Sequence, residues 1–172
     1  VKDPTADVMQ APLTPWLAAH RDSLMELFEV RELIEPGAAA LAAQRACPRT
    51  IQAMRQTLEE MERAHQDGDL VGAVMADAEF HHLIMKATGN KLLIKLLDNI
   101  VHLLEEGRKA SLRVPGQTAR AIAGHRQILE AIAANDGEAA ARAMSTHLRD
   151  AKFYMLQELE RQDLSSTLFK SG

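Results

Sequence analysis

The stretch HRQILEAIAANDGEAAARAMSTHL, residues 125–148, predicts two helices joined by a tight turn. Before the turn, Leu129 and Ile132 recur at helical spacing, and Met144 continues an apolar stripe after it. The NDG sequence between them is typical of a turn, and Asp136 can cap the N-terminus of the second helix. Two adjacent helices with a short connection pack antiparallel. This stretch therefore predicts one corner of a helical bundle.

The rest of the chain divides in the same way. Apolar residues at three-and-four spacing predict four earlier helices, at about 23–46, 50–66, 69–87 and 90–113. A fifth at about 117–134 leads into the long final helix. We expect Asp69 and Asn90 to cap two of these helices, and Gly89 to take the left-handed position that ends one. The predicted fold is all-α, an antiparallel bundle of about six helices.

Composition and charge narrow the function. Aromatic residues make up only 3% of the 172 residues, and runs of the strand type are missing. The net charge is -4, so the chain presents no large basic surface that could neutralise phosphates, and we do not expect it to bind DNA by itself. Cys47 is the single cysteine, and no apolar run approaches the roughly 18 residues of a membrane span. A reducing cytoplasm is the expected location.

Domain organisation follows from proline content and periodicity. Residues 1–22 hold three of the six prolines and no sustained helical pattern, so we interpret them as an interdomain linker. Residues 23–165 form the expected helical domain, and residues 166–172 a C-terminal tail. The chain starts with Val1 rather than methionine, and we expect it to be part of a longer protein.

Four polar residues interrupt the apolar stripes of three predicted helices. Asp77 and His81 are four residues apart, so they lie one above the other on the inner face of their helix. His125 and His147 share the inner faces of two later helices. Because each residue rises about 1.5 Å, these two histidines lie at nearly the same height, almost equally far from the turn at 135–136. All four are expected to meet at mid-height in the bundle.

This set of residues predicts a metal site. A buried carboxylate is costly by itself, but a divalent ion supplies the opposite charge and binds each neutral imidazole through one nitrogen. Three histidines and one aspartate favour zinc, with nickel or manganese as further candidates, and an octahedral ion would keep two positions for water or a ligand. A hydrogen-bonded Asp-His network in the core is the alternative.

Arg31 also lies on an apolar stripe, and a buried guanidinium requires an anion. Glu35, four residues later, could form an ion pair with it. The alternative is that Arg31 binds the carboxylate of a ligand next to the metal. Both interpretations remain open at this point.

Two pairs of a glutamate and a histidine could indicate a di-iron site, and a catalytic motif would indicate an enzyme. Glu62 with His65 and Glu79 with His82 match the Glu-x-x-His spacing of di-iron bundles, but the two pairs lie at different heights, so we reject a di-iron site. No nucleophile elbow, phosphate-binding glycine loop or His-Glu-x-x-His motif is present in the sequence. We therefore expect the chain not to be an enzyme.

Three segments together resemble the effector-binding FCD domain of the FadR subgroup of GntR transcription regulators. They are LFEVRELIEPGAAALAAQRA at 27–46, DAEFHHLIMKATGN at 77–90, and the stretch at 125–148 quoted above. The resemblance covers about residues 24–150. Each segment is a weak signal alone, but the order and spacing of the segments, together with the TGN turn at 88–90, are specific for this family.

The resemblance implies both a ligand set and an effector. Metal-binding members place an Asp and a His four apart on one helix and a His on each of two later helices, which is similar to Asp77, His81, His125 and His147. The family also implies a small carboxylate effector that reaches the metal, and an arginine in the first helix near the pocket, matched by Arg31.

The resemblance further implies a homodimer whose winged helix-turn-helix modules bind operator DNA. Residues 1–22 cannot form such a module, so we expect it to lie outside this chain. The predicted function is the sensing of an organic acid by a bacterial transcription regulator. Two other functions remain open: a metal-dependent helical enzyme acting on a small organic acid, and a metal-free interaction bundle.

Overall fold

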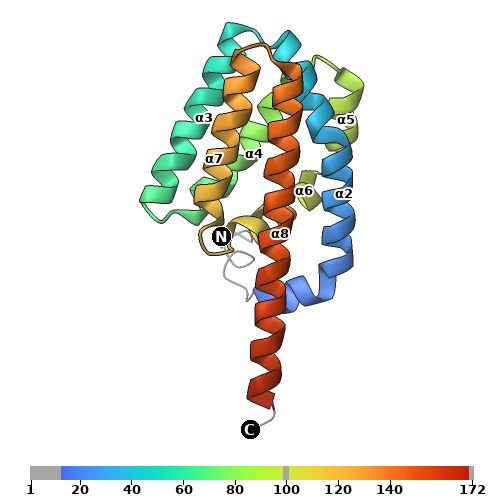
Figure 1. Cartoon of the computed structure of the whole chain (residues 1–172), viewed down its shortest axis with the longest axis vertical. Coiled ribbons are helices and arrows are strands. Elements are labelled where there is room, and N and C mark those ends of the chain that lie inside the picture. Colours follow the sequence, from blue (N-terminus) through green and yellow to red (C-terminus); the bar gives the residue numbers. More distant parts are fainter. Residues whose placement is uncertain (1–12, 99–100, 171–172) are drawn as a thin grey trace, which may run out of the picture.

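The computed structural model describes the backbone of residues 13–98 and 101–170. Within these ranges every regular element is a helix, which confirms the predicted all-α bundle (Figure 1). The helices are α2 (Leu13–Arg45), α3 (Pro48–Gln66), α4 (Leu70–Ala87), α5 (Lys91–Asp98), α6 (Val101–Leu112), α7 (Gln117–Ala133) and α8 (Gly137–Lys170). None of these helices is long and apolar enough to span a bilayer.

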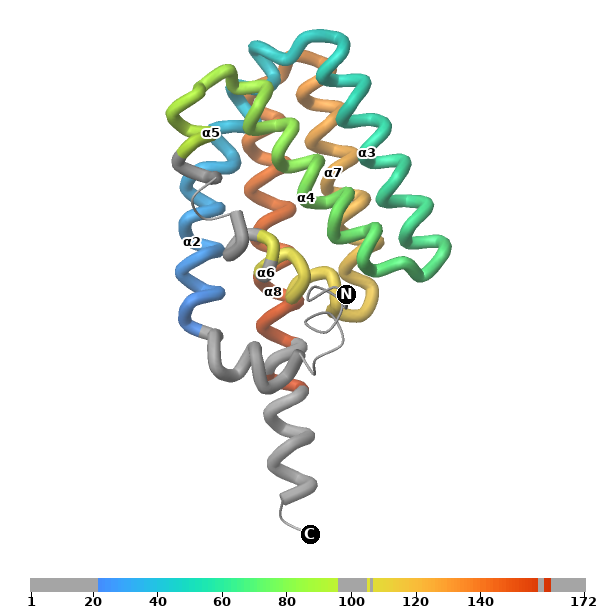
Figure 2. Tube along the Cα trace, turned by 180° about the vertical axis from the view of Figure 1, so that it is seen from behind, coloured from blue at the N-terminus to red at the C-terminus, as the bar shows by residue number. Residues whose placement is uncertain are grey.

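The helices pack with α4 and α8 in central positions. Helix α8 lies along α2 on one side and α7 on the other, and α3 packs against α4 and α7 (Figure 1). Seen from behind, α4 crosses the bundle and contacts α2, α3, α5 and α6 (Figure 2). Residues far apart in the sequence can therefore meet where α2, α4, α6, α7 and α8 face one another.

Side-chain caps begin three of the helices, and a glycine turn ends one helix, where the sequence predicted. The carboxylate of Asp69 accepts a hydrogen bond from the amide of Gly72 at 2.9 Å, and Asn90 caps α5 by accepting from two backbone amides. Asp136 caps α8 in the same way. Gly89 has φ 65°, the left-handed conformation expected after α4.

Three helix boundaries differ from the prediction. Helix α8 continues to Lys170 and so includes most of residues 166–172, which were predicted as a C-terminal tail. Helix α2 begins at Leu13, ten residues before the expected start, and continues through Pro36. Pro15 lies in the first turn of α2, where a missing N–H costs little. The stretch predicted as one helix at 90–113 contains the two described helices α5 and α6, and residues 99–100 between them lie outside the described residues. Apolar residues continue in the sequence from one helix to the other, so periodicity could not separate them.

The apolar core forms two clusters separated by a polar layer. The larger cluster contains Ala38 and Ala42 of α2 and Met144 of α8, and the smaller contains Phe28 of α2 and Met155 of α8. Between these positions the two helices carry buried polar residues, Arg31 and Glu35 on α2 and His147 on α8. The candidate site lies in this layer.

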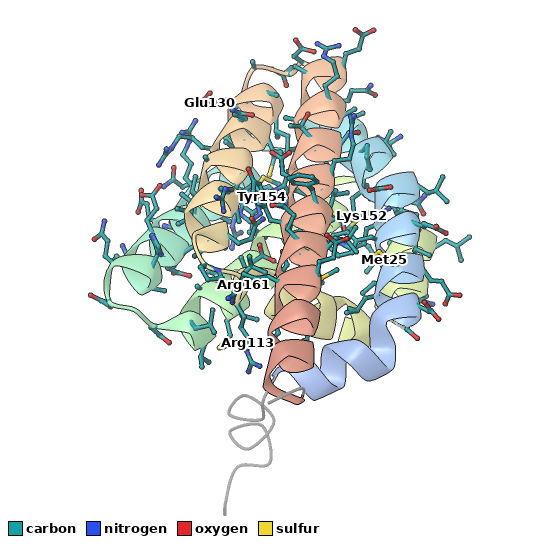
Figure 3. All side chains as sticks on the ribbon, turned by 60° about the horizontal axis from the view of Figure 1, so that its bottom comes forward. Met25, Arg113, Glu130, Lys152, Tyr154 and Arg161 are labelled. Atoms are coloured by element: carbon teal, nitrogen blue, oxygen red, sulfur yellow. The ribbon has the colours of Figure 1, made fainter. Side chains whose placement is uncertain are left out.

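Contacts on both sides of α8 hold it in place. The amine of Lys152 lies 3.5 Å from a carboxylate oxygen of Glu32 on α2, and Figure 3 shows Lys152 pointing toward that helix. On the other side, the guanidinium carbon of Arg120 on α7 lies 3.8 Å from the ring centre of Tyr154. These contacts fix the neighbours of α8 close to the polar layer.

Candidate metal centre

The structure brings together the four residues that the sequence predicted as metal ligands. Asp77 and His81 come from α4, His125 from α7 and His147 from α8. One donor atom from each lies within 4.8 Å of the others, and all four residues are buried. This agrees with the positions inferred from helix spacing and turn symmetry.

Two of the distances within the quartet are those expected between ligands of one ion. Nε2 of His125 lies 3.3 Å from Nε2 of His81 and 3.4 Å from Oδ1 of Asp77. Two ligands bound at about 2.0–2.1 Å to one tetrahedral zinc are about 3.3–3.4 Å apart. The donor set and these separations fit a divalent transition metal.

Packing fixes the orientation of two of the imidazoles. The ring of Phe80 stacks on His125 with centres 4.3 Å apart and planes 15° apart. Gly124 makes room for His147, because a Cβ at that position would lie 2.8 Å from the Nδ1 of His147. The glycine next to His125 is therefore what permits the close approach of α8.

Glu35 links Arg31 to the histidine cluster. The Nε of Arg31 donates to Oε1 of Glu35 at 2.7 Å, and Nδ1 of His81 lies 2.6 Å from the other carboxylate oxygen. A carboxylate at Nδ1 favours the tautomer of His81 that leaves Nε2 as the metal-binding atom. The sequence predicted the Arg31 pair but not the contact of Glu35 with His81.

A second buried arginine, which the sequence analysis missed, lies beside the quartet. The Nε of Arg108 on α6 is 3.3 Å from Oδ2 of Asp77, and its Nη2 is 4.0 Å from Oε1 of Glu35. The side chain of Arg108 is only 7% exposed. Two guanidinium groups and two carboxylates thus surround the histidines in the polar layer.

The electrostatic environment keeps the site ready for a cation. Burial, with repulsion by His81 and Arg108, holds the pKa of His125 well below its ordinary value. Burial, with repulsion by His125, does the same to the pKa of His147. Burial alone would raise the pKa of Glu35, but Arg31 and His81 hold it well below its usual value. The lowered pKa values favour neutral imidazoles at His125 and His147, the form in which histidine binds a metal, and the lowered pKa of Glu35 favours its charged form.

The two buried arginines differ in how well their charges are compensated. Burial acts to lower the pKa of Arg31, but the hydrogen-bonded Glu35 raises it above its ordinary value. Burial and repulsion by Arg31 lower the pKa of Arg108, and the carboxylates of Glu35 and Asp77 offset this only in part. Arg108 is the less compensated of the two cations.

A pocket of about 1000 Å³ opens along α4 and reaches the polar layer. Its inner end is lined by Glu35, His81 and Arg108, and its outer part by residues of α3, α4, α5 and α6. His82, next to His81 in the sequence, is partly exposed and lines this pocket. A small ligand could therefore approach His81 from the α4 side.

Three other histidines lie outside the quartet and His82. His65 is exposed at the end of α3 and is not part of the quartet. The side chains of His20 and His102 lie outside the described residues.

Comparisons with known proteins identify the family. The model of the FCD domain matches residues 26–150. The chain is 30% identical over 146 residues to the HTH-type transcriptional regulator LutR of Bacillus subtilis (strain 168), which covers 82% of this chain and 66% of that protein. It is 29% identical over 141 residues to the Putative L-lactate dehydrogenase operon regulatory protein of Escherichia coli (strain K12), covering 80% of this chain and 53% of the relative.

A solved structure agrees with these relatives. The Streptococcus agalactiae GntR matches with a TM-score of 0.63 and 28% identity, over 75% of this chain and 58% of that one. The chain belongs to the FCD domain family, the effector-domain class of FadR-like GntR regulators. It spans about two thirds of the Bacillus relative and about half of the Escherichia relative.

Proposed function

We propose that this FCD domain senses a small organic acid through a bound divalent metal, and so regulates transcription. One observation carries the proposal: donor atoms of Asp77, His81, His125 and His147 lie within 4.8 Å of one another in a buried layer. A pocket reaches the same layer at His81. The relatives are named as transcriptional regulators, which favours sensing over catalysis.

The metal would be held by the four residues and would be zinc, with nickel or manganese as alternatives. When bound, the ion supplies a positive centre that attracts a carboxylate. The chain's own residues prepare for this: burial keeps His125 and His147 neutral, and Glu35 orients His81. No catalytic base is required for sensing.

The effector is a small carboxylate. One relative is named for an L-lactate dehydrogenase operon, which is consistent with an organic acid. The sequence predicted Arg31 in the first helix as the contact for the acid, but its Nε is hydrogen-bonded to Glu35 and it is not among the residues that line the pocket. Through this pair, Arg31 also supports His81, so it can influence the metal whether or not it touches the ligand.

Binding would act on helix packing. The polar layer is made by residues of α2, α4, α6, α7 and α8, and a ligand that binds one arrangement of these helices better shifts the population toward it. In a homodimer, this shift would change the spacing of winged helix-turn-helix modules on operator DNA. Those modules lie outside the 172 residues of this chain.

Metal analysis tests the proposal directly. Protein purified without chelator is expected to contain about one metal ion per chain, and His125→Ala and His147→Ala to lose it. His82→Ala is the matched control, because His82 lines the pocket without belonging to the quartet. A chelator should lower the Tm of the wild type. Metal-free protein with a Tm that chelator does not change would indicate a polar network instead.

A screen of carboxylic acids tests the second half of the proposal. Acids that bind are expected to raise the Tm only when the metal is present. An acid that raises the Tm equally with chelator present would show that the metal is not part of the effector site.

A further inference from the structure

Arg31 and Arg108 are both buried beside the quartet, but they differ in their partners. Arg31 makes a 2.7 Å hydrogen bond to Glu35 through its Nε. The contacts of Arg108 to the carboxylates of Asp77 and Glu35 are longer, 3.3 Å and 4.0 Å. Arginine normally binds carboxylates by two short, parallel hydrogen bonds. The contacts of Arg108 to Asp77 and Glu35 are longer than such hydrogen bonds, so its guanidinium could bind a ligand carboxylate in this way.

Access to the pocket also separates the two arginines. Arg108 lines the inner end of the pocket together with His81, whereas Arg31 is not among its lining residues. A ligand that enters along α4 would therefore meet the guanidinium of Arg108 beside the metal. Arg31 lies behind Glu35, on the far side of the carboxylate from His81.

The outer part of the pocket carries the opposite charge. Five carboxylates line it, from Glu60, Asp67, Asp69, Glu79 and Glu105. Among the described residues that line this part, the cationic side chains are Arg63 and Lys109. A carboxylate at the inner end is attracted by the ion and Arg108, but a second carboxylate on the same ligand would face this acidic lining.

We propose that the pocket takes a small monocarboxylate whose carboxylate is bound by the guanidinium of Arg108 beside the metal. This inference rests on the proposed function and specifies the class of effector and its recognition residue. The ion and Arg108 attract one negative charge, and the acidic outer lining excludes ligands that carry a second. Arg31 then acts through Glu35 and His81 rather than on the ligand.

Two acids with the same head group test the charge preference. 2-Hydroxybutanoate and malate share the 2-hydroxy acid head and a four-carbon chain, but malate carries a second carboxylate. Isothermal titration with protein loaded to one zinc per chain is expected to show 2-hydroxybutanoate binding at least tenfold more tightly. Equal binding, or tighter binding of malate, overturns the monocarboxylate assignment.

Arg108 variants test the recognition residue. Arg108→Gln is expected to weaken binding of 2-hydroxybutanoate at least tenfold, and Arg108→Lys, which lacks the two-pronged group, at least threefold. Arg142→Gln, a change of an exposed arginine on α8 that does not line the pocket, is the control and should leave the affinity unchanged. Zinc content and the circular dichroism melting curve are measured for every variant, and titrations use zinc-loaded folded protein.

The outcomes separate this inference from the proposed function. Unchanged affinity in either Arg108 variant overturns the role of Arg108 while acid sensing by the metal centre stands. If zinc-loaded wild-type protein binds neither acid nor any other monocarboxylate in the screen, the inference and the proposed effector class fail together. If the wild-type protein holds no metal, the proposed metal centre is refuted. Metal analysis gives this result without any acid.

Discussion

Replacing Gly124 by alanine tests whether the metal centre depends on close contact between α7 and α8. An added Cβ would lie 2.8 Å from Nδ1 of His147 and 3.2 Å from its Cβ. Because the second contact is to an atom attached directly to the backbone, rotation of the imidazole cannot relieve all of the crowding. Helix α8 must shift by a few tenths of an ångström, or His147 must leave its position.

The magnitude follows from two opposing effects. Alanine is favoured over glycine inside a helix by roughly 0.5–1 kcal/mol, whereas overpacking a filled core costs about 1–3 kcal/mol. Gly124→Ala is therefore expected to destabilise the metal-free protein by about 0–2.5 kcal/mol. Gly37→Ala is the matched control in α2, because no atom lies within 4 Å of its added Cβ. It should stabilise the protein by about 0.5–1 kcal/mol.

Metal affinity separates the two variants further. Gly124→Ala moves one of four donors, and we expect zinc to bind at least tenfold more weakly, which is about 1.4 kcal/mol. Gly37→Ala should bind zinc like the wild type. Competition with a chromogenic chelator measures the affinity, and urea unfolding in excess chelator measures the stability. Wild-type zinc affinity in Gly124→Ala would refute the claim that this glycine positions His147.

Three further predictions concern pH, ion pairing and helix capping. The metal-free protein should lose stability as pH falls below about 6.5. The pKa values of His125 and His147 are lowered in the folded protein, so the unfolded state binds more protons in this range. The loss is up to about 1.4 kcal/mol per pH unit for each histidine. The depressed pKa of Glu35 adds a further loss as pH falls below 4.5, and urea unfolding in chelator at pH 7.5, 5.5 and 4 checks both windows. Glu35→Ala should destabilise the protein by about 3–5 kcal/mol, because Arg31 keeps its buried charge without its hydrogen-bonded partner. Urea unfolding measures the change, and a loss of stability below about 1 kcal/mol would contradict this prediction. Asp69→Ala removes a cap and should cost about 1 kcal/mol with zinc affinity unchanged, so altered zinc binding would count against a purely local role.

The ligand quartet could be predicted from the sequence because helix geometry is regular. A spacing of four places Asp77 and His81 on one face of a helix, and equal distances from one turn place His125 and His147 at one height. Both arguments need only an unbroken helix or a tight turn. The structure has these features at α4 and at the α7–α8 connection, so the four residues meet.

Arg108 was missed because the same regularity fails before it. The stretch predicted as one helix at 90–113 contains the two described helices α5 and α6. From one helix to the next the direction of a helix face cannot be counted from residue to residue. The contact of Glu35 with His81 was missed for another reason: it joins α2 to α4, and the relative rotation of two helices depends on the packing of the whole bundle.

The polar layer explains why binding in this bundle can alter its shape. Buried ion pairs contribute little net stability, because the cost of desolvation offsets their attraction. Apolar residues in place of Arg31 and Glu35 would therefore stabilise the fold at least as well. The layer divides two apolar clusters, and both clusters include residues of α2 and α8. A metal ion and a carboxylate change the charge balance only in this layer. Under the proposed function, the free energy of binding would therefore act where α2, α4, α6, α7 and α8 meet, and a change of packing there would involve the two longest helices, α2 and α8.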